Sequence, residues 1–355
     1  MQKNKFVFTL FLSLAVILFQ FCSKKDSTGS SGTTTTTVVT PNLSATAFNY
    51  NVTYPAHIQT ALAGNDNTPA DNPITNDGAT LGRVLFYDKH LSKNNTISCA
   101  SCHKQASSFT DNAQFSKGFE NGLTSKNSMP VLNLRFYKSG KMFWDERSES
   151  VEKQALQPIQ NTVEMGLTLA ELESKVKALS YYPSLFQKAF GSTTIDSVRI
   201  AKALAQFMRS IVTFQSKYDQ VKQGLASFTP QEAAGEQLFL NVPPGGNSCA
   251  GCHTPPMFLT SAPAAPFAFP LEAGINGQNR FKSSSLRNIA STAPYFHSGN
   301  IPNLTRLLSG GPVGAPDHIP AHTVPPADVA NVMAFLNTLS DNSVTTDIKF
   351  SDPFQ

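Results

Sequence analysis

The chain contains 355 residues, of which 40% are apolar and 15% are charged, and it carries a formal net charge of +4 at pH 7. This length is sufficient for two compact domains, each with a sizeable core, and the composition is ordinary for a folded protein. The positive charge is too small to indicate nucleic acid as a partner, so we expect none.

The N-terminal segment predicts export. Two lysines precede an almost continuous apolar run at residues 6–21, which is short for a membrane-spanning helix. We interpret residues 1–22 as a lipoprotein-type signal peptide, with Cys22 lipidated and attaching a periplasm-facing protein to a membrane. Phe21 stands where the usual motif has a small residue, so a plain signal peptide and an uncleaved anchor stay open.

The chain beyond the signal divides by composition. Residues 23–47 are rich in Ser, Thr and Gly and predict a flexible tether. We expect an N-terminal domain at residues 48–222, a C-terminal domain at residues 223–343 and a C-terminal tail at residues 344–355. Most of the signals within these domains are helical.

Three helix starts are clear. Thr168 with Glu171 forms a capping box, and Thr229 followed by Pro and Glu is another strong start. Asp196 can cap a longer helix that we expect to continue to about Tyr218, because its apolar residues recur at helical spacing.

A Cys-x-x-Cys-His motif occurs twice, at Cys99, Cys102 and His103 and at Cys249, Cys252 and His253. This is the attachment signature of a c-type haem, in which the thiols form thioethers and the His binds iron. Zinc fits poorly, because its sites usually gather four ligands with longer His spacings. The sequence therefore predicts two covalently bound haem c groups and, since only Cys22 remains, no disulfide.

A weak internal repeat accompanies the two motifs. The segment Gly-Arg-Val-Leu-Phe at residues 82–86 precedes the first, much as Gly-Glu-Gln-Leu-Phe at residues 235–239 precedes the second. We expect a mainly α fold with two cytochrome c-like helical domains, each carrying one covalently attached c-type haem.

Further motifs follow in the order of a known family. They are Phe-Trp-Asp at residues 143–145, Gln-Ala-Leu-Gln-Pro-Ile-Gln-Asn at 154–161, Val-Glu-Met-Gly at 163–166, Ser-Leu-Arg-Asn at 285–288 and Ala-Pro-Tyr-Phe-His at 293–297. Together with the haem motifs they resemble the bacterial di-haem cytochrome c peroxidase family, which also contains MauG, the methylamine dehydrogenase maturation enzyme. The resemblance extends from about residue 78 to residue 340.

The resemblance implies that the two haems have different roles. The haem on His103 would bind hydrogen peroxide, and the haem on His253 would receive electrons from a small cytochrome c or cupredoxin. Glu164 matches the carboxylate that moves a proton as the O–O bond breaks, with Gln154 beside it. Trp144 matches a Trp that lies between the haems and aids electron transfer, whereas ordinary core packing is the alternative role.

The resemblance also implies a calcium ion. Asn127 and the backbone carbonyls of Thr292 and Pro294 match the positions that hold it, and carbonyl oxygens suit a hard cation. His57 and His90 belong to no motif, and we interpret them as surface or loop residues.

Two departures from the family pattern concern iron ligands. Many relatives cap the resting first haem with a His in the region that corresponds to residues 115–124, which contain no His here, so we expect this haem to rest open. The position of the Met or Tyr that ligates the second haem in relatives falls on Gly311. His318 and His322 remain nearby in a Pro-flanked loop; ordinary loop residues are the alternative role, and as a sixth ligand we prefer His318.

The sequence thus predicts a di-haem cytochrome c peroxidase that reduces hydrogen peroxide to water. A MauG-like oxidase that modifies a protein substrate is the first alternative. A non-catalytic electron-transfer cytochrome is the second, although Glu164 and Gln154 argue against it. The sequence does not determine the oligomeric state, and a homodimer is one alternative.

Overall fold

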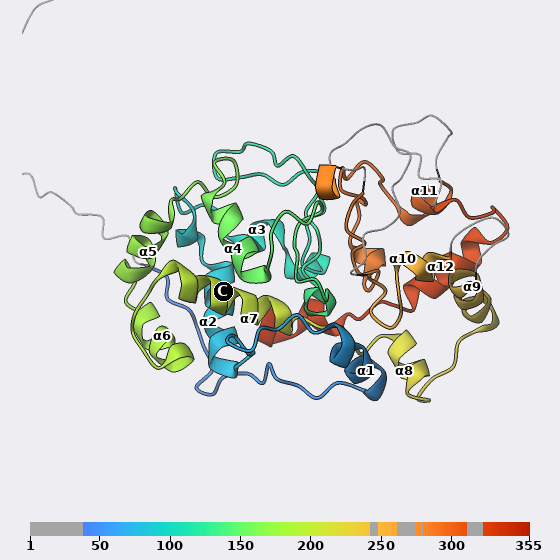
Figure 1. The fold of residues 1–355 in the computed structure, drawn as a ribbon, viewed down its shortest axis with the longest axis horizontal. Helices are drawn as coiled ribbons and strands as arrows, with labels where there is room; N and C mark the ends of the chain where they lie inside the picture. Colours follow the sequence, from blue (N-terminus) through green and yellow to red (C-terminus); the bar gives the residue numbers. More distant parts are fainter. Residues whose placement is uncertain (1–37, 242–247, 261–273, 278–279, 311–321) are drawn as a thin grey trace, which may run out of the picture. The chain divides into compact units, whose positions relative to one another are not determined.

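The computed structural model describes residues 38–241, 248–260, 274–277, 280–310 and 322–355 (Figure 1). These residues contain helices, turns and isolated β-bridges but no strand, which confirms the mainly α class. No helix among them is long and apolar enough to cross a membrane. The signal segment, with Cys22, lies outside the described residues, as does His318.

The α-helices follow one another with short 3₁₀ turns between several of them. They are α1 Ala56–Asn65, α2 Asn76–Tyr87, α3 Cys99–Cys102, α4 Val151–Gln160, α5 Leu169–Ala178, α6 Tyr182–Phe190, α7 Ser197–Ser210, α8 Lys217–Lys222, α9 Pro230–Leu240, α10 Cys249–Cys252, α11 Leu304–Leu308, α12 Val329–Asn337 and α13 Ser343–Thr346. In Figure 1, α2 to α7 lie together on one side and α9 to α12 form a second group.

Apolar side chains gather in two clusters. The larger one joins α2, α4, α5, α6 and α7, and the C-terminal residues Val344 and Phe350 return to it. The smaller one includes Phe239 on α9, Phe335 on α12 and the loop residue Phe258. Burial of the aliphatic and aromatic side chains of each cluster stabilises the fold through the hydrophobic effect. The division at residues 222 and 223 stays a prediction, because residues 40–355 form one compact unit.

The weak sequence repeat corresponds to a repeated helix crossing. A Cβ atom placed on Gly82 of α2 would lie 2.0 Å from the carbonyl oxygen of Ala203 on α7. A Cβ atom on Gly235 of α9 would lie 2.0 Å from the carbonyl oxygen of Asn331 on α12. In both pairs, glycine therefore allows two helix backbones to approach more closely than any side chain would permit.

Replacing Gly82 with Ala should lower the urea midpoint of unfolding. The new methyl group meets backbone rather than a flexible side chain, so we expect a loss of about 1–3 kcal/mol, typical of overpacking. Gly64→Ala in α1 is the matched control, because a Cβ atom there has nothing within 4 Å. Ala is also the better helix former, so the control should be neutral or slightly stabilised. Equal loss in both variants would contradict the close-crossing explanation.

The predicted helix starts at Thr168 and Thr229 are confirmed, and both are capping boxes. Thr168 Oγ1 accepts the backbone N–H of Glu171 at 3.2 Å, and the Glu171 carboxylate accepts the N–H of Thr168 at 2.7 Å. Thr229 and Glu232 make the same pair of bonds, at 3.2 and 2.7 Å. These starts were predictable because every atom involved lies within three residues.

The end of α7 was not predicted correctly. The helix ends at Ser210 rather than near Tyr218. The Asp341 carboxylate accepts the backbone N–H groups of Phe214 and Gln215, both at 2.9 Å, so these donors do not continue the helix. A partner distant in the sequence has therefore outweighed the local helical pattern.

A buried ion pair links α8 to the Ser-Leu-Arg-Asn motif. The two nitrogens of the Arg287 guanidinium end donate to the two carboxylate oxygens of Asp219, each at 2.7 Å, and both side chains are 0% exposed. His57 on α1 places Nε2 2.8 Å from Asp219 Oδ1. The His57 side chain is partly exposed at the start of α1, and His90 lies in a short 3₁₀ turn, where its Nδ1 is 2.7 Å from Asp88 Oδ1.

Candidate functional site

The first Cys-x-x-Cys-His motif begins on a single helical turn, α3. Ser98 and Ser101 cap this turn reciprocally. Residues three apart on a helix are neighbours on its surface, so the thiols of Cys99 and Cys102 lie on one side. Cys102 and His103 line a cavity of about 420 Å³, which we call the first cavity.

The His103 ring is held by a backbone carbonyl. Its Nδ1 lies 3.0 Å from the carbonyl oxygen of Phe109, a buried residue with a positive φ of 59°. The N–H of Val131 also donates to this carbonyl, at 3.3 Å. A ring that donates from Nδ1 keeps Nε2 for a metal, and burial lowers the pKa of His103, which favours the neutral form that binds iron.

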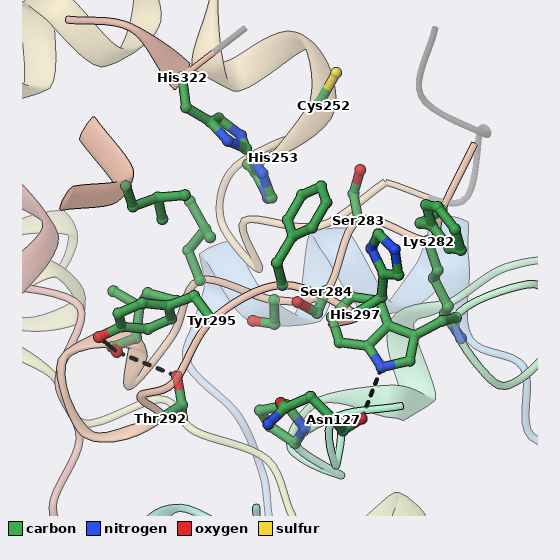
Figure 2. Close-up of a pocket in the computed structure, with 18 of the residues that line it drawn as sticks. Asn127, Cys252, His253, Lys282, Ser283, Ser284, Thr292, Tyr295, His297 and His322 are labelled. Carbon is green, nitrogen blue, oxygen red and sulfur yellow. Dashed lines mark hydrogen bonds between the residues drawn. The ribbon is translucent and has the colours of Figure 1, made fainter. Parts of the chain in front are cut away.

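The second motif holds its histidine ring in the same way as the first. Cys249, Cys252 and His253 line a second cavity of about 230 Å³ (Figure 2). His253 Nδ1 lies 3.3 Å from the carbonyl oxygen of Phe258, whose φ is also positive, at 53°. Leu286, in the Ser-Leu-Arg-Asn motif, donates its N–H to the same carbonyl at 3.0 Å. Burial lowers the pKa of His253 to about 4.

These two arrangements fit haem better than zinc. No group of three or more His, Cys, Asp or Glu side chains that could hold a metal ion occurs among the described residues. A proximal imidazole with two adjacent thiols is instead the complete donor set for a c-type haem.

Glu164 and Gln154, the predicted distal residues, line the first cavity together with His103. The turn after α4 positions Glu164, because the Asn161 side chain accepts its N–H at 3.2 Å. Burial raises the pKa of Glu164, and the positive charge of Arg147 opposes this only in part. A carboxyl group with a raised pKa holds its proton more readily than an exposed one, so it is better suited to act as both proton acceptor and proton donor.

Trp144 lies where the two cavities adjoin, since it lines both. Its Nε1 donates to the carbonyl oxygen of Asn127 at 2.8 Å, the bond that is dashed at Asn127 in Figure 2. The indole also meets the ring of His297 edge to face, with centroids 6.3 Å apart. This position is consistent with a role between the two sites.

Lys282 also lines both cavities, and sequence reasoning missed it because no motif marks it. The residue is only 4% exposed. Its Nζ donates to the carbonyl oxygen of Lys141 at 2.7 Å and lies 3.5 Å from the centre of the Tyr137 ring. Burial lowers its pKa to about 7, and the charge of Glu146 opposes the shift. The titratable amine of Lys282 therefore lies in the wall that the two cavities share.

The predicted calcium residues also come together. Asn127, Thr292 and Pro294 all line the second cavity. The Asn127 amide nitrogen donates to the carbonyl oxygens of Ala113 and Gln114, at 3.1 and 3.2 Å. Calcium itself stays a prediction. His322, which follows an undescribed segment, lines the second cavity as well.

Comparisons with known proteins agree with these two sites. A family model described as di-haem cytochrome c peroxidase matches residues 76–227. The cytochrome c551 peroxidase of Nitrosomonas europaea is 34% identical over 254 residues, which cover 67% of this chain and 74% of that protein. The methylamine utilization protein MauG of Methylophilus methylotrophus is 30% identical over 250 residues, which cover 68% of this chain and 73% of that protein.

Solved structures agree as well. A MauG-like protein associated with microbial copper homeostasis matches with a TM-score of 0.74 and 28% identity, covering 87% of this chain and 100% of the other. The diheme peroxidase BthA from Burkholderia thailandensis shares the fold, with a TM-score of 0.64, 21% identity and coverage of 78% and 89%. Two haem-attachment motifs on matching scaffolds and these relatives show that the chain belongs to the di-haem cytochrome c peroxidase and MauG family of oxidoreductases.

Proposed function

We propose that the protein reduces hydrogen peroxide to water with electrons from a small redox protein. The observation that carries this proposal is the partly buried carboxyl group of Glu164 on the same cavity as His103. Haem bound through Cys99, Cys102 and His103 would supply the iron at which peroxide is reduced. Reduction to two water molecules consumes two electrons and two protons, so the cavity needs a group that moves protons.

Glu164 is proposed as that group. As the carboxylate, it accepts the proton of the inner peroxide oxygen, and as the acid it returns this proton to the outer oxygen, which leaves as water. Gln154, from α4, is proposed to orient the peroxide from the same wall of the cavity. Trp144 is proposed to conduct electrons from the second site, because it lines both cavities.

The direct test is steady-state peroxide turnover with a reduced small cytochrome c or cupredoxin. The purified protein should carry two haems that resist acid-acetone extraction, and it should oxidise the donor in proportion to the peroxide consumed. Absence of turnover with every donor in a protein with two haems would refute the peroxidase proposal. A MauG-like oxidase would then be favoured, a reading supported by the 30% identity to MauG and the likeness to the MauG-like structure.

The first haem should bind external ligands without prior reduction. His103 is the sole histidine among the described residues that line the first cavity, so no imidazole is placed there to cap the iron. Cyanide added to the fully oxidised protein should therefore shift the spectrum of one haem, as followed by absorbance titration. Binding that requires one-electron reduction would indicate a protein ligand such as Met129, which also lines the cavity.

Export and lipid attachment are further proposals. In bacteria, c-type haem is attached outside the cytoplasm, so a chain with two attachment motifs needs a signal such as the apolar run before Cys22. Lipidation of Cys22 would hold the protein to a membrane on the periplasmic side. Calcium at Asn127, Thr292 and Pro294 is proposed on the family resemblance. The division into two haem domains near residue 222 is proposed on the repeated haem motifs, and a homodimer is a further proposal.

A further inference from the structure

A second imidazole faces the proximal histidine of the second site. The rings of His253 and His322 lie with their centroids 6.4 Å apart and their planes inclined by 35°. Both line the second cavity, and Figure 2 shows the two rings next to each other, to the left of Cys252 and Ser283. The separation is too large for stacking contact.

This separation fits one metal ion between the rings. Metal–imidazole bonds are about 2 Å long and each ring centre lies about 1 Å behind its nitrogen, so two imidazoles on opposite sides of one ion have centres roughly 6 Å apart. The observed 6.4 Å agrees with this value. By contrast, the third histidine of the cavity, His297, stacks on Phe281 with centroids 3.6 Å apart and planes inclined by 13°. His297 therefore packs against an aromatic ring.

The backbone that carries His322 is anchored on its C-terminal side. The N–H of Val324 donates to the carbonyl oxygen of Leu308, the last residue of α11, at 2.8 Å. Thr323 packs so tightly on Gly310 that a Cβ atom on this glycine would lie 2.0 Å from Thr323 Oγ1. The φ of Gly310 is +68°, which also favours glycine. These contacts fix the position of His322 relative to α11, so it is not an arbitrary loop residue.

We infer that His322 is the sixth ligand of the haem iron held by His253, in place of the Met or Tyr that the family pattern leads one to expect. The inference rests on haem attachment at Cys249 and Cys252, and it does not depend on whether the protein reduces peroxide. A bis-imidazole iron would be saturated, which suits electron transfer and leaves ligand binding to the first haem. Its potential would lie below that of a His–Met haem.

The test is spectroscopic, in the full chain with both haems loaded. In the oxidised protein the second haem should be low-spin without a Met–iron charge-transfer band, and His322→Ala should convert this one haem to high-spin. Added imidazole should restore the low-spin spectrum, because it can occupy the vacated position. His318→Ala is the matched control and should leave the spectrum unchanged.

Two results would overturn the assignment. One is a low-spin spectrum that persists in His322→Ala with two haems bound; the other is loss of the low-spin signal in His318→Ala.

If His322→Ala does not bind its second haem, the variant His322→Met decides the question. His322→Met should bind both haems and stay low-spin. Its second haem should gain the Met–iron charge-transfer band and have a higher reduction potential. An unchanged potential and spectrum would exclude His322 as a ligand. Peroxide turnover does not enter either readout, so failure here leaves the peroxidase proposal standing.

Discussion

Replacing Glu164 with Gln should lower peroxide turnover by about 10²–10⁴-fold, the usual contribution of general acid–base catalysis. The amide keeps the size and polarity of the side chain but cannot accept and return a proton. Haem content and the potential of the second haem should be unchanged, because Glu164 lines the first cavity and not the second. The measurement is steady-state turnover with a reduced donor, accompanied by haem quantification.

The pH dependence gives a second readout for the same variant. Glu164 must be ionised to accept the first proton, so kcat/KM should rise as pH passes upward through its pKa. Burial raises this pKa above the usual range for Glu, so the rising limb should lie at correspondingly higher pH, and it should vanish in Glu164→Gln. Glu120→Gln is the control, since Glu120 is exposed and lies outside both cavity linings. A near-normal rate in Glu164→Gln would assign proton transfer to another group.

Replacing Asp219 with Asn should destabilise the protein by about 3–5 kcal/mol, because it leaves the buried guanidinium of Arg287 without its counter-charge. Asp219 also accepts the backbone N–H of Ser216 at 3.0 Å, so the loss extends to the start of α8. Arg287 Nε donates to the carbonyl oxygen of Pro256 at 2.9 Å, next to the loop that holds His253. The second haem environment should therefore loosen together with the fold. Urea unfolding monitored by circular dichroism and by haem absorbance would measure both effects.

The same pair predicts how stability changes with pH. Burial alone would raise the pKa of Asp219, but the hydrogen bonds and charge of Arg287 outweigh it and hold the pKa below the usual value. For a carboxyl group whose pKa is lower in the folded state, the stabilisation is complete above the unfolded-state pKa of about 4 and is lost as pH falls through the folded value. The decrease in the free energy of unfolding at acid pH should therefore be smaller in Asp219→Asn.

An exposed ion pair provides the control for this prediction. Lys153 and Glu149 lie on the surface, with side chains that are 65% and 74% exposed. Glu149→Gln should change stability by less than about 1 kcal/mol, because solvent screens exposed pairs. If Asp219→Asn were no more harmful than Glu149→Gln, the buried pair would not hold the structure around His253.

The sequence by itself determined the features whose atoms lie within one or two helical turns. The spacing of Cys99, Cys102 and His103 defines a haem-attachment turn, and the capping boxes at Thr168 and Thr229 specify helix starts in the same local way. Helical periodicity also gave the mainly α class. These features need no knowledge of distant residues, because local hydrogen bonds and side-chain spacing fix them.

Only the tertiary structure decided which distant residues meet. Beyond α7, backbone N–H groups donate to the distant side chains of Asn133 and Asp341 instead of continuing the helix. The buried environment of Lys282 depends on Tyr137 and the carbonyl oxygen of Lys141, which no local spacing marks. The placement of His322 next to His253 depends on the contacts of its segment with α11, and no spacing in the sequence distinguishes it from His318. In each case the contact arises because packing of separate helices brings together side chains whose separation along the chain carries no periodic signal.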